Sequence, residues 1–381
     1  MRKLNIGLLG AGNMGRTHAY ALNSMKYFYH LTDFEPVLAG VCTRHIESAR
    51  RFAQEYGIGR ACDCEDELIN DPSIDIIDVS TPNVFHYDTL KKAIAAGKHI
   101  YCEKPLCVTG AQAEEVAALA KEAGVTAQIV FNVRHMLPMQ RARQLIEAGR
   151  LGRILSFRAV YLHSSCTDLT RSAGWKQDST VCGGGVLFDL GSHVIDLVSY
   201  LCGPFASVTS RAQIAYPLRR GMDGAEWCTN ADEAFYMLAS LACGAMGTIE
   251  VSKITLGTND DLRIEINGET GALRFDLMEP NWLWFYDGSR LPGADHNHDA
   301  GGEIGWTRIE CVGRYPEPGY ALCGVKAPIG WLRGHVTSYY SFLRAVCDGT
   351  PAVPSFDDAA QVQRVMEDAY RSAGFTPAPN L

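Results

Sequence analysis

The densest group of potentially reactive side chains in the chain lies within residues 182–196. Asp189 and His193 are four positions apart, and Asp196 follows three positions later. Because residues three or four positions apart share one face of a helix, we expect the three side chains to form one polar stripe beside the buried face. A carboxylate beside an imidazole, whose ordinary pKa is about 6.5, suits proton transfer at neutral pH. An Asp that caps the helix, with a His buried in the core, is the alternative interpretation.

A second candidate group is the motif Glu103-Lys104-Pro105, which directly follows the apolar run 99–102. A charged pair after a buried strand is hard to explain by packing alone. Pro105 restricts the residue before it to extended backbone, which would hold the Lys104 ammonium in one place. The motif therefore predicts a fixed cation at the end of a strand, with a surface turn as the alternative.

A third group follows another apolar run, at residues 74–80. It consists of Ser80, Thr81, Pro82, Asn83 and His86. In a doubly wound α/β sheet, ligands bind outside the carboxyl ends of the strands, so this group is expected to line a ligand site. Since Ser, Thr and Asn are also common helix caps, an ordinary helix start is the alternative.

A glycine motif after the first apolar run indicates what that ligand is. Residues 4–9 are apolar, and Gly10, Gly12 and Gly15 then form a GxGxxG pattern that leads into a helix at about residues 14–22. Gly10 would permit a tight turn, Gly12 would let a pyrophosphate approach the backbone, and Gly15 would let the helix pack closely on the strand. The pattern predicts a dinucleotide site, with an incidental glycine-rich turn as the alternative.

The end of the second apolar run bears on the choice between NAD and NADP. An acidic residue at this point normally binds the ribose hydroxyls of NAD, whereas this chain has Thr43 and Arg44. A guanidinium suits the 2′-phosphate of NADP, but Arg44 could equally stack on the adenine. The residues alone therefore leave the cofactor as NAD or NADP.

Two patterns of elements position these groups. In residues 1–130, short apolar runs at 4–9, 37–42, 74–80, 99–102 and 126–131 alternate with helical patterns at 14–22, 46–56, 87–96 and 111–123. This alternation predicts an α/β Rossmann domain, a doubly wound parallel sheet that binds NAD(P). In residues 131–381, strand-like runs at 154–163, 233–241, 245–254, 262–266 and 272–277 precede a final helix at 356–373. They predict a substrate-binding α+β C-terminal domain with a large, mainly antiparallel open sheet.

Composition narrows the class of protein. The 381 residues are enough for two domains of roughly 150 residues each. A net charge of −8 with scattered basic residues disfavours a nucleic acid partner. No apolar run approaches the roughly 18 residues needed to cross a membrane, so no membrane partner is expected either.

Cysteine and histidine usage argues against metal sites. The 13 cysteines are odd in number and form no CxxC pair, which favours free thiols in a reducing, cytoplasmic location. The Asp-His-Asn-His-Asp cluster at residues 295–299 lies in a Gly/Pro-rich stretch. A solvated loop is therefore expected there, and no metal is predicted.

Taken together, these motifs resemble the Gfo/Idh/MocA family of oxidoreductases, which includes inositol and glucose dehydrogenases and glucose-fructose oxidoreductase. The glycine motif, the Thr-Pro-Asn turn at 81–83, the Glu-Lys-Pro motif and the run 184–196 occur in the family's order and spacing. Segments 23–36, 131–134 and 152–162 resemble the branch that contains levoglucosan dehydrogenase and the enzymes that oxidise the sugar C3 of glycosides.

The resemblance implies roles for the candidate residues. His193 would be the base for a substrate hydroxyl, Lys104 would stabilise its oxygen, and Asp189 would orient a neighbouring hydroxyl. The residues expected to contact the cofactor are Gly10, Gly12, Asn13, Met14, Gly15, Thr43, Arg44, Ser80, Thr81, Pro82, Asn83, His86, Glu103, Lys104, Pro105 and Asn132. Those expected to contact substrate are Lys104, Arg134, Tyr161, His163, Trp175, Lys176, Asp189 and His193. A homo-oligomer, dimer or tetramer, formed through the C-terminal sheet is also implied.

The implied activity is NAD(P)-dependent hydride transfer between nicotinamide and a secondary hydroxyl, of C3 type, on a sugar, cyclitol, anhydrosugar or glycoside. One alternative is cleavage of a glycosidic bond through transient C3 oxidation by tightly bound NAD(H). A second is a non-catalytic dinucleotide-binding protein. Net release of NADH separates the first two, and the presence of Lys104, Asp189 and His193 argues against the last, because binding alone needs only the glycine loop.

Overall fold

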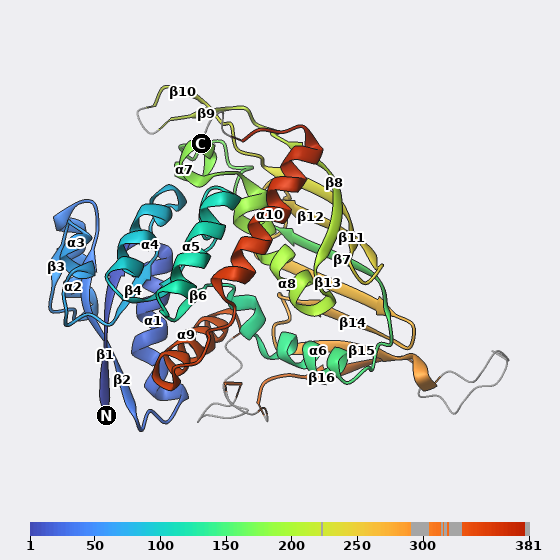
Figure 1. The fold of residues 1–381 in the computed structure, drawn as a ribbon. Helices are drawn as coiled ribbons and strands as arrows, with labels where there is room; N and C mark the ends of the chain where they lie inside the picture. Colours follow the sequence, from blue (N-terminus) through green and yellow to red (C-terminus); the bar gives the residue numbers. More distant parts are fainter. Residues whose placement is uncertain (222–223, 291–304, 314, 316–317, 320–329, 378–381) are drawn as a thin grey trace, which may run out of the picture.

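Six parallel strands form a doubly wound sheet in the N-terminal part of the molecule (Figure 1). In spatial order they are β3 (Ala61–Cys62), β2 (Phe34–Cys42), β1 (Arg2–Leu9), β4 (Ile76–Val79), β5 (His99–Cys102) and β6 (Ala127–Ile129). Leu8 and Leu9, which point to opposite faces of β1, are both buried, because helices cover both sides of the sheet. The expected Rossmann arrangement is confirmed, and its order reverses between β1 and β4, where such sheets bind ligands.

The computed structural model describes residues 1–381 except 222–223, 291–304, 314, 316–317, 320–329 and 378–381. The helices of the first sheet are α1 (Asn13–Phe28), α2 (Ile46–Tyr56), α3 (Asp66–Ile69), α4 (His86–Ala95) and α5 (Gly110–Glu122). The sequence prediction for α2 matches the structure, whereas α1 continues well past the expected end at Leu22. The cluster at 295–299 lies outside the described residues, and no group of metal-ligating side chains occurs within them.

An eight-stranded sheet dominates the second half of the chain and confirms the expected α+β class. Its order is β16 (Trp306–Glu310), β15 (Trp282–Asp287), β14 (Gly271–Asp276), β13 (Asp261–Gly268), β7 (Ile154–Leu162), β12 (Met246–Ser252), β11 (Ala234–Leu241) and β8 (Phe205–Gln213). Neighbouring strands are antiparallel except for the parallel pair β7 and β12. The short strands β9 (Leu218–Arg220) and β10 (Glu226–Cys228) form a separate antiparallel pair.

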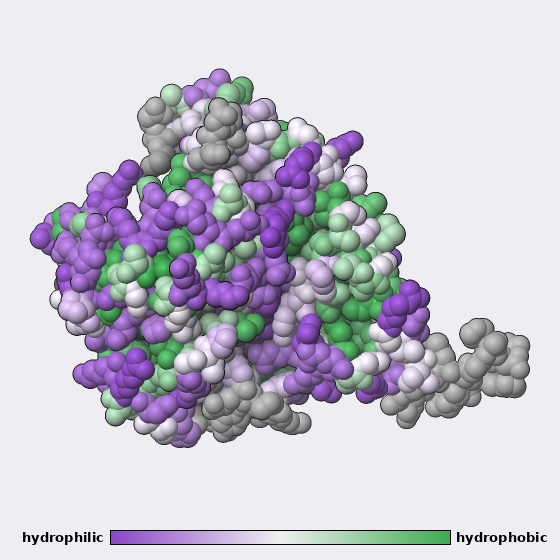
Figure 2. Space-filling view, in the orientation of Figure 1, coloured by the Kyte–Doolittle hydropathy of each residue, from purple (hydrophilic) through white to green (hydrophobic). Residues whose placement is uncertain are grey.

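Helices cover one face of this sheet and leave the other open. α6 (Leu137–Glu147), α7 (Ser179–Cys182), α8 (Ser192–Cys202) and α10 (Phe356–Ala373) belong to this half, and α8 and α10 contact β7 and β8. Along β11, Phe235 and Met237 are buried while Tyr236 and Leu238 are exposed, as the alternation of a strand requires. Figure 2 shows hydrophobic residues gathered on the side of the molecule that carries this sheet, whereas the Rossmann side is mainly hydrophilic.

The C-terminal part of the chain returns to the Rossmann sheet through a helix that the sequence analysis did not predict. α9 (Trp331–Asp348) packs against α1 (Figure 1), and Tyr339 and Leu343 join Leu4 and Met25 in one hydrophobic cluster. The predicted domain boundary between residues 130 and 131 divides the chain by sequence. In space, α9 packs with the helices and strands of the N-terminal domain although it lies after that boundary.

Residues 179–202 correct the expectation that no apolar run is long enough to cross a membrane. Within these 24 residues, a window of 18 has a mean hydropathy of 1.4, enough by length and composition alone, but 83% of that window is buried inside the protein. It contains a wide π-helical turn at Leu187–Gly191 that leads into α8. Its apolar residues therefore belong to the core of the second half.

Candidate active site

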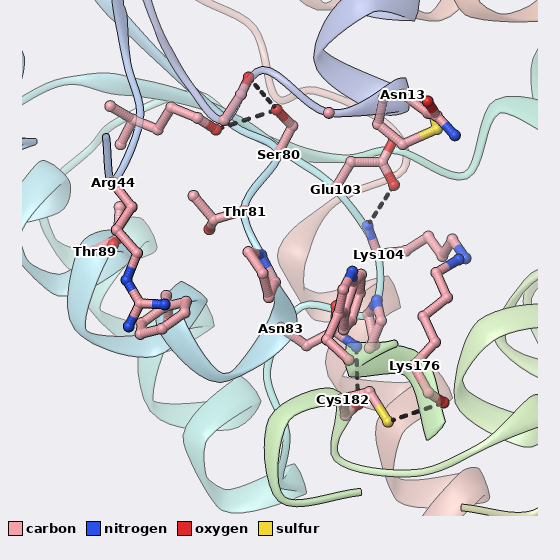
Figure 3. A pocket seen from close by; sticks show the side chains of 18 of the residues that line it. Asn13, Arg44, Ser80, Thr81, Asn83, Thr89, Glu103, Lys104, Lys176 and Cys182 are labelled. Atoms are coloured by element: carbon pink, nitrogen blue, oxygen red, sulfur yellow. Dashed lines mark hydrogen bonds between the residues drawn. The ribbon is translucent and has the colours of Figure 1, made fainter. Parts of the chain in front are cut away.

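A cavity of about 1110 Å³ lies where the carboxyl ends of β1, β2, β4 and β5 face the second domain (Figure 3). Of the predicted site residues, those that line it are Gly10, Gly12, Asn13, Met14, Thr43, Arg44, Ser80, Thr81, Pro82, Asn83, Glu103, Lys104, Pro105, Trp175, Lys176 and Asp189. Figure 3 shows Arg44 at one end and the ammonium groups of Lys104 and Lys176 together at the other. The cavity thus joins the glycine motif to the polar groups of both domains.

The three glycines of the motif each have a distinct geometric reason. Gly10 has a φ of +106°, and a Cβ on it would lie 2.6 Å from the carbonyl oxygen of Ser80. A Cβ on Gly15 would lie 2.3 Å from the carbonyl oxygen of Gly10, so α1 packs tightly on the loop. A Cβ on Gly12 would meet nothing within 4 Å and would project from the cavity wall. The first N–H groups of α1 have no side-chain cap, which suits a pyrophosphate.

The loops after β4 and β5 are tied together beneath the cavity. His86 is fully buried, with its ring nitrogens 2.9 Å from the carbonyl oxygen of Thr81 and 3.0 Å from that of Pro105. Burial lowers the pKa of His86, and a neutral ring can donate to only one of these carbonyls at a time. Asn83 donates from Nδ2 to the carbonyl oxygen of Cys182 at 2.8 Å, which links the β4 loop to the second domain.

A buried charged network supports Lys104 from below. The ring of His18 lies 2.8 Å from Asp78 Oδ1 and 3.2 Å from Glu103 Oε1, and Tyr339 donates its hydroxyl to Asp78 at 2.8 Å. The backbone N–H of Lys104 donates to Glu103 Oε2 at 3.1 Å. Burial opposes the charge on His18, but the two carboxylates outweigh it and raise the pKa of His18 to about 10. His18 is therefore an imidazolium that holds Glu103 and the end of β5 in place.

Three lysines converge on the carboxylate of Asp189. Lys104 Nζ lies 2.8 Å from Oδ1, while Lys176 Nζ and Lys253 Nζ lie 2.9 and 2.8 Å from Oδ2. Lys104 also donates to the backbone oxygen of Asp189 at 2.6 Å. Burial opposes ionisation of Asp189, but the three ammonium groups hold its pKa well below the ordinary range. Asp189 is thus an anion that fixes three cations at the inner end of the cavity.

His193 lies one turn beyond Asp189, outside the cavity lining. Its ring packs edge-on against Phe131 and Tyr161, with centroids 6.0 and 6.1 Å away. Nδ1 is buried and has no hydrogen-bond partner in the part of the chain that the structure describes. Burial, reinforced by the Lys104 ammonium, lowers the pKa of His193 to about 3. The imidazole is therefore neutral at pH 7.

Arg134 and Asp196 form a buried ion pair away from the cavity. The Arg134 guanidinium donates to both oxygens of Asp196, at 2.8 and 2.5 Å, and to Asp358 at 3.2 Å. The expectation that Asp189, His193 and Asp196 share one polar stripe is therefore wrong for Asp196. The wide turn at Leu187–Gly191 offsets Asp189 from α8, and Asp196 faces Arg134 of η2 (Asn132–His135).

The other predicted residues surround this core. Tyr161 donates to Asp260 Oδ1 at 2.7 Å, and His163 Nε2 lies 3.1 Å from the same oxygen. Asn132 is buried, and its Nδ2 has no partner among the described residues. Gly15, His86, Asn132, Arg134, Tyr161, His163 and His193 are not among the residues that line the cavity.

Two site residues were missed by the sequence analysis. Lys253 directly follows β12, in the same way that Glu103 and Lys104 follow β5, but the strand was expected to continue to Ile254. The strand ends at Ser252, so Lys253 leaves the sheet and lines the cavity. Asp260 lies just before β13 and carried no signal of its own in the sequence.

The fold and the site together define a dinucleotide-binding oxidoreductase with a Rossmann domain and an open-sheet domain. The family described as oxidoreductase, NAD-binding Rossmann fold (GFO/IDH/MocA) matches residues 4–131, and the GFO/IDH/MocA C-terminal domain matches residues 139–274. An uncharacterized oxidoreductase of Schizosaccharomyces pombe is 36% identical over 81% of this chain and 82% of its own. The chain belongs to the GFO/IDH/MocA oxidoreductase family, as its motifs predicted, and its first domain is an NAD-binding Rossmann domain.

Relatives with named activities match nearly the whole chain. Levoglucosan dehydrogenase of Pseudarthrobacter phenanthrenivorans is 29% identical over 98% of this chain and 97% of its own. A solved structure of levoglucosan dehydrogenase in complex with NADH and levoglucosan has a TM-score of 0.88 at 28% identity and covers 98% of both chains. The similarity therefore spans both domains.

Proposed function

We propose that this protein is an NAD-dependent dehydrogenase that transfers a hydride between nicotinamide and a secondary hydroxyl, at C3, of a carbohydrate. The observation that carries the proposal is the single cavity that runs from the glycine motif to the ammonium of Lys104 and the carboxylate of Asp189. The similarity to levoglucosan dehydrogenase supports a carbohydrate substrate. The position of the hydroxyl rests on the resemblance to the C3-oxidising branch.

Each residue of the site would have a separate role in oxidation of the alcohol. Bound NAD⁺ would supply the hydride acceptor. Lys104, held by Asp189, would donate a hydrogen bond to the reacting oxygen and stabilise its developing negative charge. His193, half-buried and one turn beyond Asp189, would accept the hydroxyl proton. Asp189 would keep the ammonium of Lys104 pointed at that oxygen.

NAD is proposed over NADP because the end of the cavity near Arg44 (Figure 3) carries acidic as well as basic side chains. Arg44, Thr43 and Lys92 line the cavity, but so do Asp63 and Glu65. Glu65 is already paired with Lys92 at 2.9 Å, so it is the Asp63 carboxylate that would oppose a 2′-phosphate. Steady-state kinetics with each cofactor test this choice. We expect a higher kcat/KM with NAD⁺, and a higher value with NADP⁺ would contradict it.

An absorbance assay at 340 nm tests the dehydrogenase directly. NAD⁺ is mixed with levoglucosan, aldoses, cyclitols and glycosides, and net NADH is recorded together with the sugar products. We expect stoichiometric NADH and a ketosugar. Release of free sugar from a glycoside without net NADH would instead indicate cleavage by bound cofactor. No reaction with any compound would leave only dinucleotide binding.

We also propose that the protein forms a homo-oligomer through the open face of the second sheet and works in the cytoplasm. Tyr236, Leu238 and Met246 are 43%, 50% and 52% exposed on that face, large apolar side chains that a partner copy would cover. The cysteines of the described residues are all free, as in a reducing compartment. Light scattering of the wild type and of Leu238→Lys would test the oligomer, which the charge should dissociate.

A further inference from the structure

The inner end of the cavity carries more positive than negative charge. Three ammonium groups, those of Lys104, Lys176 and Lys253, share the one carboxylate of Asp189. Figure 3 shows Lys104 and Lys176 meeting at this point from the two domains. Formally these four groups sum to two positive charges. The side chains of Lys104 and Lys253 are only 13% and 7% exposed, whereas that of Lys176 is 47% exposed. A buried charge is costly unless it is paired, and the two buried ammonium groups share one carboxylate, so their excess of one positive charge calls for an anion.

No other carboxylate of the described residues is placed to balance these cations. Glu103 faces the imidazolium of His18 at 3.2 Å, beneath the cavity. Asp260 is held by Tyr161 and His163. Asp232 accepts hydrogen bonds from backbone N–H groups at Gly185 and Leu187. Each of these acids already has its own partners, so the charge of the lysines stays uncompensated.

Lys253 is the clearest case of a positive charge that is only partly compensated. Its side chain is only 7% exposed, and Asp189 is its one ion-pair or hydrogen-bond partner among the described residues. An ammonium has three donors, so donors of Lys253 remain unused in a buried place. Lys176 is 47% exposed, and the neighbouring ammonium groups of Lys253 and Lys104 help to lower its pKa against the attraction of Asp189. Despite burial, Asp189 already raises the pKa of Lys253, so a bound anion would occupy the remaining donors of Lys253 and offset the repulsion between ammonium groups at Lys176.

The geometry also fits a single anionic group. Lys176 and Lys253 approach the same oxygen of Asp189, at 2.9 and 2.8 Å, from the cavity wall. Their ammonium groups are therefore close enough for one further carboxylate or phosphate to contact both. Oxidised nicotinamide, which is itself positive, would add to the charge that such a group offsets.

We propose that the physiological substrate is an anionic carbohydrate, whose carboxylate or phosphate binds Lys176 and Lys253 while its reacting hydroxyl binds Lys104. This inference rests on the proposed function, because it assigns the substrate class of the same site. Lys176 and Lys253 are thereby specificity-determining residues. Neutral sugars can enter the site but leave the excess charge unbalanced.

Matched substrate pairs test the proposal. With NAD⁺ at saturation, kcat/KM is measured for glucose against glucuronate, for glucose against glucose 6-phosphate, and for neutral levoglucosan. We expect at least one anion to exceed its neutral partner about 10–100-fold, the range of a hydrogen bond between charged groups. The preference should fall as salt is raised. The two anions separate a carboxylate from a phosphate as the recognised group.

Substitutions of the two lysines test whether Lys176 and Lys253 cause the preference for an anionic substrate. Lys253→Met and Lys176→Met, which remove charge but keep length, should reduce the ratio of anionic to neutral kcat/KM toward one, while Lys253→Arg should keep it. Lys121→Met, an exposed residue on α5, is the control and should leave the ratio unchanged. Circular dichroism and the melting temperature verify that each variant is folded.

The outcomes separate this proposal from the one on which it rests. If neutral sugars give NADH as efficiently as every anion tested, the dehydrogenase stands and the anionic substrate class is overturned. If an anion is preferred but Lys253→Met and Lys176→Met keep the preference, the assignment to these lysines is overturned. If no carbohydrate of either kind gives NADH, the proposed function itself fails and this inference with it.

Discussion

Lys104 holds Asp189 by two contacts, with Nζ 2.6 Å from the backbone oxygen and 2.8 Å from Oδ1. The two residues come from different domains and are 85 positions apart in the chain. Because the contact includes a backbone oxygen, it fixes the position of the chain at Asp189 as well as that of its carboxylate. The ammonium is thereby held at the cavity wall, where residues of both domains meet.

Replacement of Lys104 by Met should remove most of the activity and little of the cofactor affinity. General acid–base groups typically contribute 10²–10⁴-fold, so kcat/KM for the best substrate should fall by about that factor. Fluorescence titration with NADH should give a Kd close to that of the wild type. The control is Lys121→Met, on the exposed side of α5. A Lys104→Met enzyme that keeps more than about a tenth of wild-type kcat/KM would show that the ammonium is not catalytic.

The pH dependence should report a histidine that is already neutral. Burial and Lys104 lower the pKa of His193 to about 3, below its ordinary value of about 6.5. A base with a lowered pKa keeps its active, unprotonated form as pH falls, so His193 should produce no acid limb near pH 6.5 in kcat/KM. His193→Ala should still reduce kcat/KM about 10²-fold or more. An acid limb at about pH 6.5 that disappears in this variant would contradict the account.

His18→Ala should destabilise the protein in a pH-dependent way. The substitution leaves Asp78 and Glu103 buried without their cation, which costs about 3–5 kcal/mol when a buried pair is broken. The pKa of His18 is raised from about 6.5 to about 10, so its contribution is complete below pH 6.5 and is lost as pH rises through 10. The melting temperature of the wild type should therefore approach that of the variant between pH 7 and 10. His30→Ala, at an exposed site, is the control; a gap that stays constant with pH would refute a charged His18.

Gly12→Ala should weaken cofactor binding without affecting stability. The added Cβ meets no protein atom within 4 Å, but Gly12 lines the cavity, where the pyrophosphate is expected to approach the backbone. We expect the Kd for NADH to rise about tenfold, equivalent to roughly 1.4 kcal/mol. Gly59→Ala is the matched control, since a Cβ there also meets nothing within 4 Å. Equal NADH affinity in the two variants would place the pyrophosphate elsewhere.

Arg134→Met should affect stability more than substrate binding. The guanidinium pairs with Asp196, whose carboxylate is buried, and loss of that partner should cost about 3–5 kcal/mol. KM for the carbohydrate should change little, because Arg134 does not line the cavity. Denaturant unfolding and steady-state kinetics on the same preparation provide the two numbers. A large rise in KM at unchanged stability would return Arg134 to the substrate site.

Sequence patterns over neighbouring residues predicted the main helices, strands and motifs of the fold. The GxGxxG loop, the bounds of α2, α10 and β5, and the placement of Lys104 after β5 all depend on neighbouring residues, and all appear as expected. These features follow from periodicity, turn chemistry and the rule that ligands bind at strand ends.

Contacts between distant segments account for what the sequence did not reveal. His18 meets Asp78 and Glu103 only after β4 and β5 pair, 60 and 85 positions away. Lys253 reaches Asp189 only because β12 ends at Ser252, a boundary that its apolar pattern does not mark. Asp196 looked equivalent to Asp189 by spacing, but the wide turn at Leu187–Gly191 and the partner Arg134 separate them. Tertiary packing determines these strand ends and side-chain partners, and patterns over neighbouring residues do not predict them.

A sugar deuterated at C3 tests directly whether a carbohydrate secondary alcohol transfers its hydride to NAD⁺. The transfer is proposed to occur beside the Lys104–Asp189 pair. The NADH formed by the wild type and by Lys104→Met is analysed by mass spectrometry. We expect one deuterium in the nicotinamide of the wild-type product and almost no labelled product from the variant. Unlabelled NADH from the deuterated sugar, or equal labelling by the variant, would contradict it.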